Sequence, residues 1–475
     1  INAGKVTLAP GRQTIRFKFH SDNNNHGGLD CFVFSRRPFM PRGALKPGAR
    51  TGKANPGFFA WEPDVDEFRD DALVDLRSLN EDAAGQNGRV KAEGNDFVLG
   101  SGEKVKFWGA NVGPGVCRLD HASHVYLAKH LAKHGVNLVR LHGAIYGSRD
   151  PAVNFEQLDD LHHFVSVLKE EGIYVKLSFF FPLWFHLDGD RRPFMLLYFD
   201  PEMQKLYFQW ADALLTTSNP YTDIPLGEDP SVAIVEVVNE DSHFFWTFGK
   251  KNMPDARWQQ FTRLYGQWLA TKYGSLDRAI GAWGGVREPT DRPDDGRMEL
   301  YDAWSMTTDG LKASAAKRKR IGDQVEFLTE NMRSFYQQAA DYFRQKCGYE
   351  GLVSSSNWHV ADARTLDALE RYCYTAGDVI DHHGYYDHNH KGDSASWSVR
   401  PGQTFQSQSA LHLRQPNPLP YVETDGYPHI ISEIGWPMPN MYRAECAFLT
   451  ATYGSLQGLD GIIHFAVGSP AWTRP

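Results

Sequence analysis

The feature that most constrains the fold is a repeated alternation of short apolar runs with helix-like segments between residues 105 and 467. Continuous apolar runs are typical of strands buried on both faces, as in parallel sheets. Such runs alternating with helical segments predict βα units. Eight runs occur, and eight parallel strands close a (β/α)8 barrel. We therefore expect an α/β chain with a (β/α)8 TIM barrel.

The boundaries of the predicted elements follow from periodicity and turn residues. Barrel strands are expected at residues 105–111, 137–142, 173–181, 233–240, 351–357, 379–385, 429–436 and 461–467. Helices are expected at 122–134, 158–171, 201–216, 258–273, 276–283 and 324–347, with a loop at 284–309. Two further strands, 90–94 and 97–99, and a hairpin turn at 100–102 precede the barrel.

The ends of the chain predict additional features. Residues 1–35 alternate in strand fashion, so we expect a β-rich segment, similar either to the end of a carbohydrate-binding β-sandwich or to a hairpin packed on the main domain. Residues 36–69 carry five prolines among glycines and charges, which predicts a linker before a barrel at 70–475. Only residues 468–475 follow the eighth strand, which favours truncation of a longer protein over an unusual closure.

The composition argues against several classes of function. Acidic residues (58) outnumber basic ones (50), giving a formal charge of −8, and no basic block suggests a nucleic-acid partner. No run of about 18 apolar residues is present, so no membrane span is expected. The five cysteines lack a CxxC pair and resemble neither a disulfide framework nor a zinc site. Because the chain begins at Ile1 without Met, we expect a trimmed start, so the absence of a signal peptide does not decide the compartment. The location that we expect is secreted or periplasmic.

Two of the predicted strands carry glutamates at their C-terminal ends. The run Ala233–Glu240 ends in Asn239 and Glu240, and the run His429–Trp436 carries Glu433. The C-terminal ends of barrel strands meet at one face, where barrel enzymes keep their reactive groups. We therefore expect Glu240 and Glu433 to face each other across the barrel mouth. Two carboxyls placed in this way are the minimum needed to hydrolyse a glycosidic bond.

A retaining hydrolysis makes different demands on the two carboxyls. The acid must hold its proton near neutral pH, so its surroundings must raise its pKa. The nucleophile must be ionised, which a nearby Arg and hydroxyl donors favour. Arg140 ends the second strand, and His383 and Tyr385 end the sixth. We expect Arg140 and Tyr385 to keep Glu433 ionised and correctly aimed.

Aromatic and polar residues near the strand ends are candidates for sugar contacts. The chain has 13% aromatic residues, including 13 Trp, and the apolar C–H face of a pyranose ring can stack on an indole. We expect Asn239 to bind the sugar hydroxyl next to the reacting carbon. The full set of expected substrate contacts is Arg140, His142, Asn239, Trp358, His383, Tyr385, Trp436 and Trp472.

The ordered set of strand-end residues resembles the clan A retaining glycoside hydrolases. Asn239 and Glu240 match the Asn-Glu pair after strand four of that clan, and Glu433 matches its strand-seven glutamate. The resemblance implies that Glu240 is the acid/base and Glu433 the nucleophile, with no cofactor. It covers roughly residues 107–467.

Two families within the clan share features with this chain, and two features depart from them. His383 and Tyr385 match a His-x-Tyr of the endoglucanase and mannanase family, while residues 268–283 are similar to a segment of clan A β-galactosidases. The third strand, at 176–181, lacks the Asp-x-His often found in the first family. The eighth strand, at 461–467, lacks the Trp that commonly lies under the reacting sugar, for which Trp472 or Trp436 is a candidate substitute.

Two other functions remain open at this stage. One is a barrel that binds a glycan without turnover, in which the carboxyls would be mispositioned. The other is a metal-dependent hydrolase, because Asp381–His390 contains four His and two Asp. Strand alternation would point these side chains in different directions, and residues 107–111 lack the His-x-His of a metal-dependent amidohydrolase barrel. We expect no metal.

Several charged residues are given structural or solvated roles. Glu236 is expected to be a buried partner of Arg140 or Lys176, because a lone buried carboxylate is costly. Lys176, as a Schiff-base lysine, would be a weaker candidate than the carboxyl pair. The four histidines between residues 121 and 134 and the basic run Lys317–Arg320 are expected to be exposed.

Overall fold

The structure is a computed structural model that describes residues 6–18, 32–34, 57, 65–187, 189, 191–386, 391–392, 402–405, 407–412, 423–438 and 440–468. The chain divides into two compact units, Ile1–Asp64 with Pro475 and Val65–Arg474. In the first unit, no strand is assigned within the described ranges 6–18 and 32–34, although the rings of Phe17 and Phe32 pack 5.0 Å apart. Most of the expected β-rich segment and linker lie outside the described residues, so both remain predictions.

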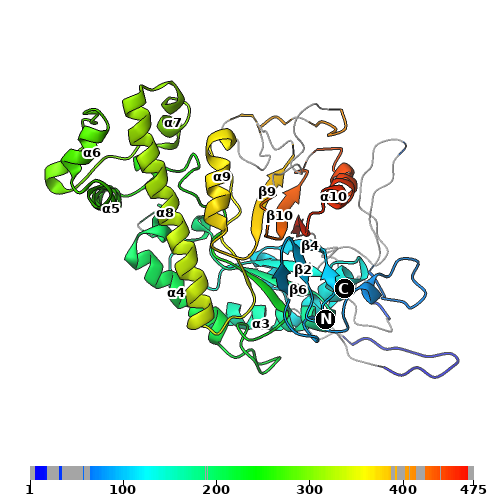
Figure 1. Ribbon diagram of the computed structural model, residues 1–475. Helices are drawn as coiled ribbons and strands as arrows, with labels where there is room; N and C mark the ends of the chain where they lie inside the picture. The colour runs from blue at the N-terminus through cyan, green and yellow to red at the C-terminus, as the bar shows by residue number, and fades with distance from the viewer. Residues whose placement is uncertain are drawn as a thin grey trace. The chain divides into compact units, whose positions relative to one another are not determined.

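The second unit confirms the predicted barrel (Figure 1). Its parallel strands are β4 Phe107–Val112, β5 Leu138–His142, β6 Tyr174–Ser178, β7 Val232–Glu236, β8 Leu352–Ser354, β9 Ile380–Tyr385, β10 His429–Gly435 and β11 Gly461–Val467. They form one sheet in the order β8-β7-β6-β5-β4-β11-β10-β9. Ser354 of β8 pairs in parallel with Val379, which precedes β9, so the two ends of the sheet meet and close the ring.

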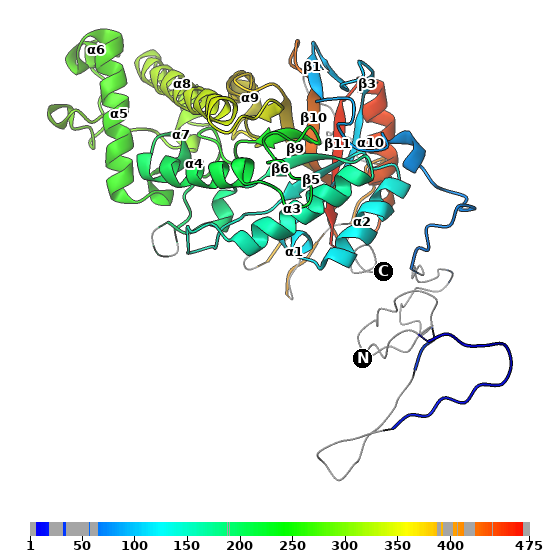
Figure 2. The ribbon, with the colours of Figure 1, turned by 90° about the horizontal axis from the view of Figure 1, so that it is seen from below.

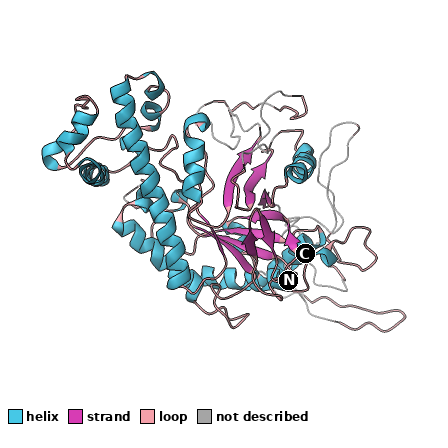
Figure 3. Ribbon diagram, viewed as in Figure 1, coloured by secondary structure: helices cyan, strands magenta, loops and turns pink. Residues whose placement is uncertain are grey.

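Helices surround these strands (Figure 3). Around the barrel they are α1 Pro114–Cys117, α2 His121–Lys133, α3 Phe155–Glu170, α4 Pro201–Thr216, α9 Ala363–Tyr374 and α10 Ala444–Gln457. Between β7 and β8 the chain adds α5 Asp255–Tyr273, α6 Leu276–Ala282, α7 Ala303–Met306 and α8 Ala315–Gln345. Short 3-10 helices occur at Arg77–Leu79, Pro182–Trp184, Leu196–Tyr198, Lys250–Asn252, Pro293–Asp295 and Gly310–Lys312. Helices α5 and α6 extend to one side, away from the sheet (Figure 2).

Local capping explains where the helices begin. The side chain of Asp120 accepts a hydrogen bond from the backbone of Ser123 at the start of α2, and Asp200 caps α4 before Pro201. Ser314 caps α8 in the same way, so α8 starts at Ala315 and not near residue 324 as predicted. These caps satisfy backbone N–H groups that have no partner within the helix.

A small hairpin closes the N-terminal end of the barrel. Strands β1 Lys91–Glu93, β2 Asp96–Val98 and β3 Lys104–Val105 form the predicted antiparallel ladder. The ring of Phe97 on β2 packs 5.2 Å from that of Phe107, the first residue of β4. Apolar residues from the beginnings of the other barrel strands join the same buried cluster. Because apolar side chains fill the N-terminal end, the C-terminal end is where the barrel can hold reactive groups.

Three sequence predictions are corrected by the structure. Strand β7 ends at Glu236, so Glu240 lies in the following connection and not on the strand itself. Arg320 is fully buried and donates to both carboxylate oxygens of Asp291, at 2.7 and 2.8 Å, so the basic run is not wholly solvated. His124 is also buried, because its helix packs this face against α3.

Candidate active site

The connection after β7 and the C-terminal ends of β9 and β10 bring three of the predicted site residues together. One carboxylate oxygen of Glu240, one of Glu433 and a ring nitrogen of His383 all lie within 4.8 Å of one another. Glu433 and His383 are almost completely buried, and Glu240 is partly exposed. The residues are therefore close in space although nearly two hundred positions separate the two glutamates in the chain.

Arg140 organises the centre of this cluster. Its Nη1 donates to Glu433 Oε1 at 2.7 Å, and its Nη2 donates to Asn239 Oδ1 at 2.7 Å. Its Nε and Nη2 also donate to the two oxygens of Glu236, at 3.0 and 2.8 Å. A fully buried guanidinium with this many acceptors has one orientation available, so it fixes both the nucleophile candidate and the amide next to Glu240.

Lys176 is a second buried cation below Arg140. Its Nζ donates to Glu236 and, at 2.9 Å, to Asp381 Oδ2. The expected pairing of Glu236 is thus with both cations, and the pKa of Glu236 is lowered because their charges outweigh the effect of burial. Asp381 in turn accepts from the backbone of Ser432, at 3.0 Å, one residue before Glu433. This network ties the base of the site to the strand that carries Glu433.

Tyr385 completes the contacts of Glu433. Its hydroxyl donates to Glu433 Oε2, while Arg140 holds Oε1, so each oxygen has its own donor. Phe465 on β11 lies beside them, with its ring 6.1 Å from that of Tyr385 and nearly perpendicular to it. Sequence reasoning did not include Phe465 among the site residues, although it lies on the strand noted for its missing Trp.

Glu240 is held differently. Its backbone adopts the left-handed region with φ of 48°, which is uncommon for a residue with a side chain and frequent at functional sites. Its N–H donates to Asn357 Oδ1 at 3.0 Å, and its Oε1 is hydrogen-bonded to His383 Nδ1 at 2.8 Å. Asn357 was likewise not among the site residues predicted from the sequence. Its place at the end of the predicted fifth strand was the signal that could have identified it.

The surroundings of the two glutamates shift their pKa values to different extents. Burial raises the pKa of Glu240 well above its usual value, and the charge of Glu433 raises it further. Burial also raises the pKa of Glu433, but Arg140 and the Tyr385 hydroxyl oppose that change by stabilising the carboxylate. The hydrogen bonds that Arg140 and Lys176 donate go to acceptors other than Glu240. The pKa of Glu240 is therefore raised more strongly than that of Glu433, so Glu433 is the first of the pair to ionise as the pH increases.

The remaining predicted residues occupy different environments. His142 is buried, with Nδ1 2.9 Å from Ser178 Oγ and its ring 4.4 Å from that of Trp184. Trp358 is half-buried, and its ring lies 6.4 Å from that of His383. Trp436 is only 4% exposed and packs on Tyr386 in an apolar cluster, an environment that does not favour a sugar contact. Trp472 lies outside the described residues.

The histidine side chains of β9 do not point to one common site. His383 faces the two glutamates, whereas His382 points to His429, with Nδ1 3.0 Å from Nε2 of that residue. Asp381 is held by Lys176. The later part of the motif lies outside the described residues. In the part of the chain that the structure describes, the one group with metal-ligand spacing is the Glu240, His383 and Glu433 cluster, where Arg140 already adds a positive charge.

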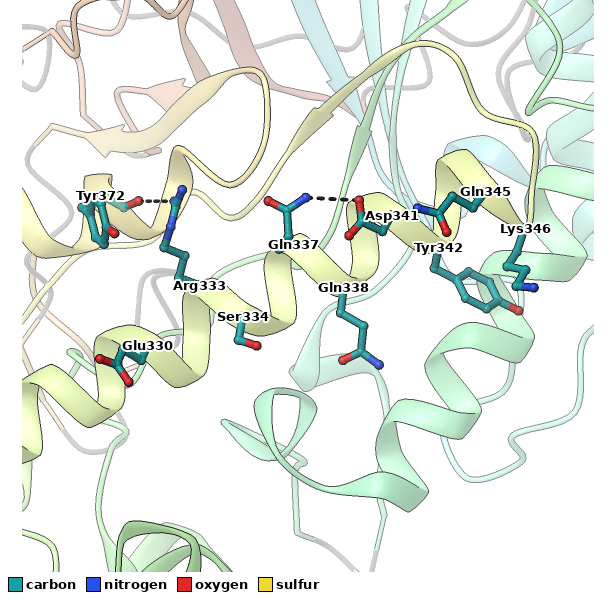
Figure 4. Close-up of a pocket in the computed structure, with 10 residues that line it drawn as sticks. All are labelled: Glu330, Arg333, Ser334, Gln337, Gln338, Asp341, Tyr342, Gln345, Lys346 and Tyr372. Atoms are coloured by element: carbon teal, nitrogen blue, oxygen red, sulfur yellow. Dashed lines mark hydrogen bonds between the residues drawn. The ribbon is translucent and has the colours of Figure 1, made fainter. Parts of the chain in front are cut away.

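A separate hollow lies on the outer face of α8 (Figure 4). It has a volume of about 680 Å³ and is lined by residues of α8 between Glu330 and Lys346, together with Tyr372 of α9. The polar side chains there pair locally, as when Arg333 donates to the Tyr372 carbonyl at 2.8 Å. None of the lining residues belongs to the Glu240 and Glu433 cluster.

Among the described residues, no helix is long and apolar enough to cross a membrane.

Comparison with known proteins gives distant likenesses in structure. No protein-family model matches the chain, and neither does a curated protein. An endo-β-1,4-mannanase from Thermotoga petrophila is 13% identical over 78% of this chain and 70% of that chain, with a TM-score of 0.43. A β-galactosidase from Bacillus circulans sp. alkalophilus is 14% identical over 77% and 51%, with a TM-score of 0.47. A β-glucanase from Saccharophagus degradans, solved with cellotetraose, is 14% identical over 86% and 91%, with a TM-score of 0.38. These likenesses are too distant to assign the chain to a family.

Proposed function

We propose that the protein is a retaining β-glycoside hydrolase that cleaves neutral β-linked poly- or oligosaccharides. The observation that carries the proposal is the separation of at most 4.8 Å between carboxylate oxygens of Glu240 and Glu433. Retaining glycosidases hold their carboxyls about 5–5.5 Å apart, whereas inverting enzymes need about 6.5–9.5 Å to admit a water molecule. The short separation leaves room for the anomeric carbon but not for an intervening water.

The proposed reaction has two steps. Glu433 attacks the anomeric carbon and forms an ester bond to the sugar, while the bond to the leaving oxygen breaks and that oxygen takes the proton of Glu240. Glu240, now ionised, removes a proton from water, and the resulting oxygen nucleophile replaces Glu433 at the same carbon. Both glutamates return to their starting protonation states, and no cofactor takes part.

The surrounding residues have assigned roles in this proposal. Arg140 and Tyr385 each donate to one oxygen of Glu433, which favours the ionised nucleophile and fixes its direction. Asn239 uses its Oδ1 to accept from Arg140, so its amide nitrogen is oriented toward another acceptor, which we propose to be a sugar hydroxyl. His383 aligns Glu240, and its pKa is well below the usual value because of burial and the nearby Arg140 charge, so it acts as a neutral partner.

Two other readings are less well supported by the geometry. A barrel that only binds glycan would have no reason to hold two carboxyls within 4.8 Å and to supply one of them with two donors. Among the described residues, a metal-dependent hydrolase would find metal-ligand spacing at the same three side chains alone, beside the guanidinium of Arg140. The second reading predicts that a chelator abolishes hydrolysis.

The proposal is tested by a hydrolysis screen on aryl β-glycosides and on β-linked glucans, mannans and galactans. The Glu433→Gln variant should lose activity on every substrate that the parent cleaves, whereas Glu240→Gln should lose most activity on substrates with poor leaving groups and less on activated aryl glycosides. A 2-deoxy-2-fluoro glycoside should form a covalent adduct on Glu433, which peptide mass spectrometry locates. An inverted product, or an adduct elsewhere, would contradict the mechanism. We also propose a secreted or periplasmic location, where the enzyme would encounter an extracellular polysaccharide. Cell fractionation tests this proposal.

A further inference from the structure

Two large indoles are exposed next to each other, one on a connection and one on the short helix α7. Trp246, in the connection between β7 and α5, is 45% exposed, and Trp304 on α7 is 53% exposed. Their ring centroids lie 6.2 Å apart at an interplanar angle of 40°. Tryptophan is highly buried on average, so a pair of exposed indoles that contact each other is an unusual surface feature. Such a pair offers a rigid apolar surface with polar N–H groups at its edge.

Two further aromatic rings lie between the carboxyl cluster and the connection that carries Trp246. Phe245 precedes Trp246, and its ring lies 4.9 Å from that of Trp358. The ring of Trp358 lies 6.4 Å from that of His383, which is hydrogen-bonded to Glu240. Phe245 and Trp358 are both half-buried, so part of each ring is accessible. We call Trp358, Phe245, Trp246 and Trp304 the aromatic track: ring contacts join Trp358 to Phe245 and Trp246 to Trp304, and the chain itself joins Phe245 to Trp246.

Hydrogen bonds hold the two loops that carry the track. Asn357, the residue before Trp358, accepts from the backbone of Glu240 at 3.0 Å. The N–H of Ala361 donates to the carbonyl of Phe244 at 2.7 Å. The loops are thus joined to each other at both ends of this stretch. A preformed aromatic surface binds an extended ligand without first losing the freedom of mobile loops.

The surroundings of the pair suit a neutral polar ligand. A pocket of about 290 Å³ adjoins it, lined by Gly249, Lys250, Asp302 and Ser305 among others, with charges of both signs. Sugar units combine an apolar C–H face, which stacks on an indole, with hydroxyls that bond to such polar groups. Because one pyranose ring stacks on one aromatic ring at a time, a track of several rings fits a chain of sugars better than a single unit.

We propose that Trp246 and Trp304 form a distal subsite that binds the same glycan chain several units away from the bond to be cleaved, so that the substrate is a polysaccharide or long oligosaccharide and not a disaccharide. This inference rests on the proposed glycosidase function. In this proposal, helix α7, which belongs to the insertion between β7 and β8, extends the surface that binds the substrate.

The test measures binding separately from hydrolysis. In the Glu240→Gln background, Trp246→Ala, Trp304→Ala and the double variant are titrated calorimetrically with β-1,4-linked gluco-, manno- and galacto-oligosaccharides of two and six units. The double variant should bind the hexasaccharide roughly 5- to 100-fold more weakly, as expected for two lost stacking contacts. The disaccharide should change by less than about twofold. Phe448→Ala is the matched control, since Phe448 is 66% exposed on α10 and outside the track.

The outcomes distinguish the two proposals. Unchanged hexasaccharide affinity in the double variant would overturn the distal subsite, while hydrolysis of the same hexasaccharide by the parent protein would still support the glycosidase. An equal loss for both ligand lengths would also overturn it, because the indoles would then act near the cleaved bond. A parent that binds none of these sugars would overturn the distal subsite, and one that also cleaves no substrate of the hydrolysis screen would overturn both proposals. Matching thermal melts of the variants show that the fold is intact.

Discussion

The hydroxyl of Tyr385 offers a direct test of how Glu433 is kept ionised. The Tyr385→Phe variant removes the donor to Glu433 Oε2 and leaves the Arg140 contact to Oε1 in place. Both oxygens belong to an almost fully buried carboxylate, so water does not readily replace the lost donor. The ionised form therefore loses stability relative to the protonated form, and the pKa of Glu433 rises.

The size of the change follows from the charge on the acceptor. A hydrogen bond to a charged group contributes about 1.5–3 kcal/mol, and one pKa unit corresponds to about 1.4 kcal/mol. The pKa of Glu433 should therefore rise by about 1–2 units. Since the nucleophile is active only when ionised, the acidic limb of kcat/KM should move to higher pH by the same amount.

The assay is the pH dependence of kcat/KM on a cleaved aryl β-glycoside, for the parent and the variant. Tyr273→Phe is the control, because it removes a similar hydroxyl that donates to Asp323 at 2.8 Å in the insertion. The control should leave the acidic limb in place. A Tyr385→Phe variant whose acidic limb moves by less than about half a unit would refute the argument that Tyr385 holds Glu433 ionised.

Four further predictions concern the acid, the metal question, the insertion and a buried carboxyl. Glu240→Gln should lower kcat by about 10²–10⁴-fold for poor leaving groups and far less for good ones, with loss of the basic limb; equal losses would contradict its role as acid. Treatment with a chelator should leave the parent's activity unchanged, and a loss restored by added metal would favour the metal-dependent reading. Arg320→Met should lower the free energy of unfolding in urea by about 3–5 kcal/mol, because Asp291 stays buried without its partner; a change under about 1 kcal/mol would contradict this. Burial raises the pKa of Asp241 to about 8, so the folded protein holds a proton that the unfolded chain releases, and stability falls as pH rises. Between pH 7 and 9 this loss is about 1.4 kcal/mol, and Asp241→Asn should remove it in denaturation measurements at the two pH values.

Local sequence was sufficient to predict most of the elements. The apolar runs and the caps depend on neighbouring residues, and α4 begins and ends as predicted at Pro201 and Thr216. The order of the eight strands followed from their number and from the closure rule for parallel barrels. The end of β7 was predicted too late, because Val237 and Val238 remain apolar and buried beyond the regular strand.

The sequence by itself determined that Glu240 and Glu433 lie at the C-terminal ends of two strands of one barrel or directly beyond them, since strand ends of a parallel sheet share a face. Tertiary structure alone decided that their oxygens come within 4.8 Å and that Arg140 reaches Glu433 across 293 positions of the chain. It also decided that Arg320 is buried. The physical reason is that periodicity reports only which face of an element is apolar. Distances between charged side chains, and hence their pKa values, depend on how the closed barrel and its insertion pack.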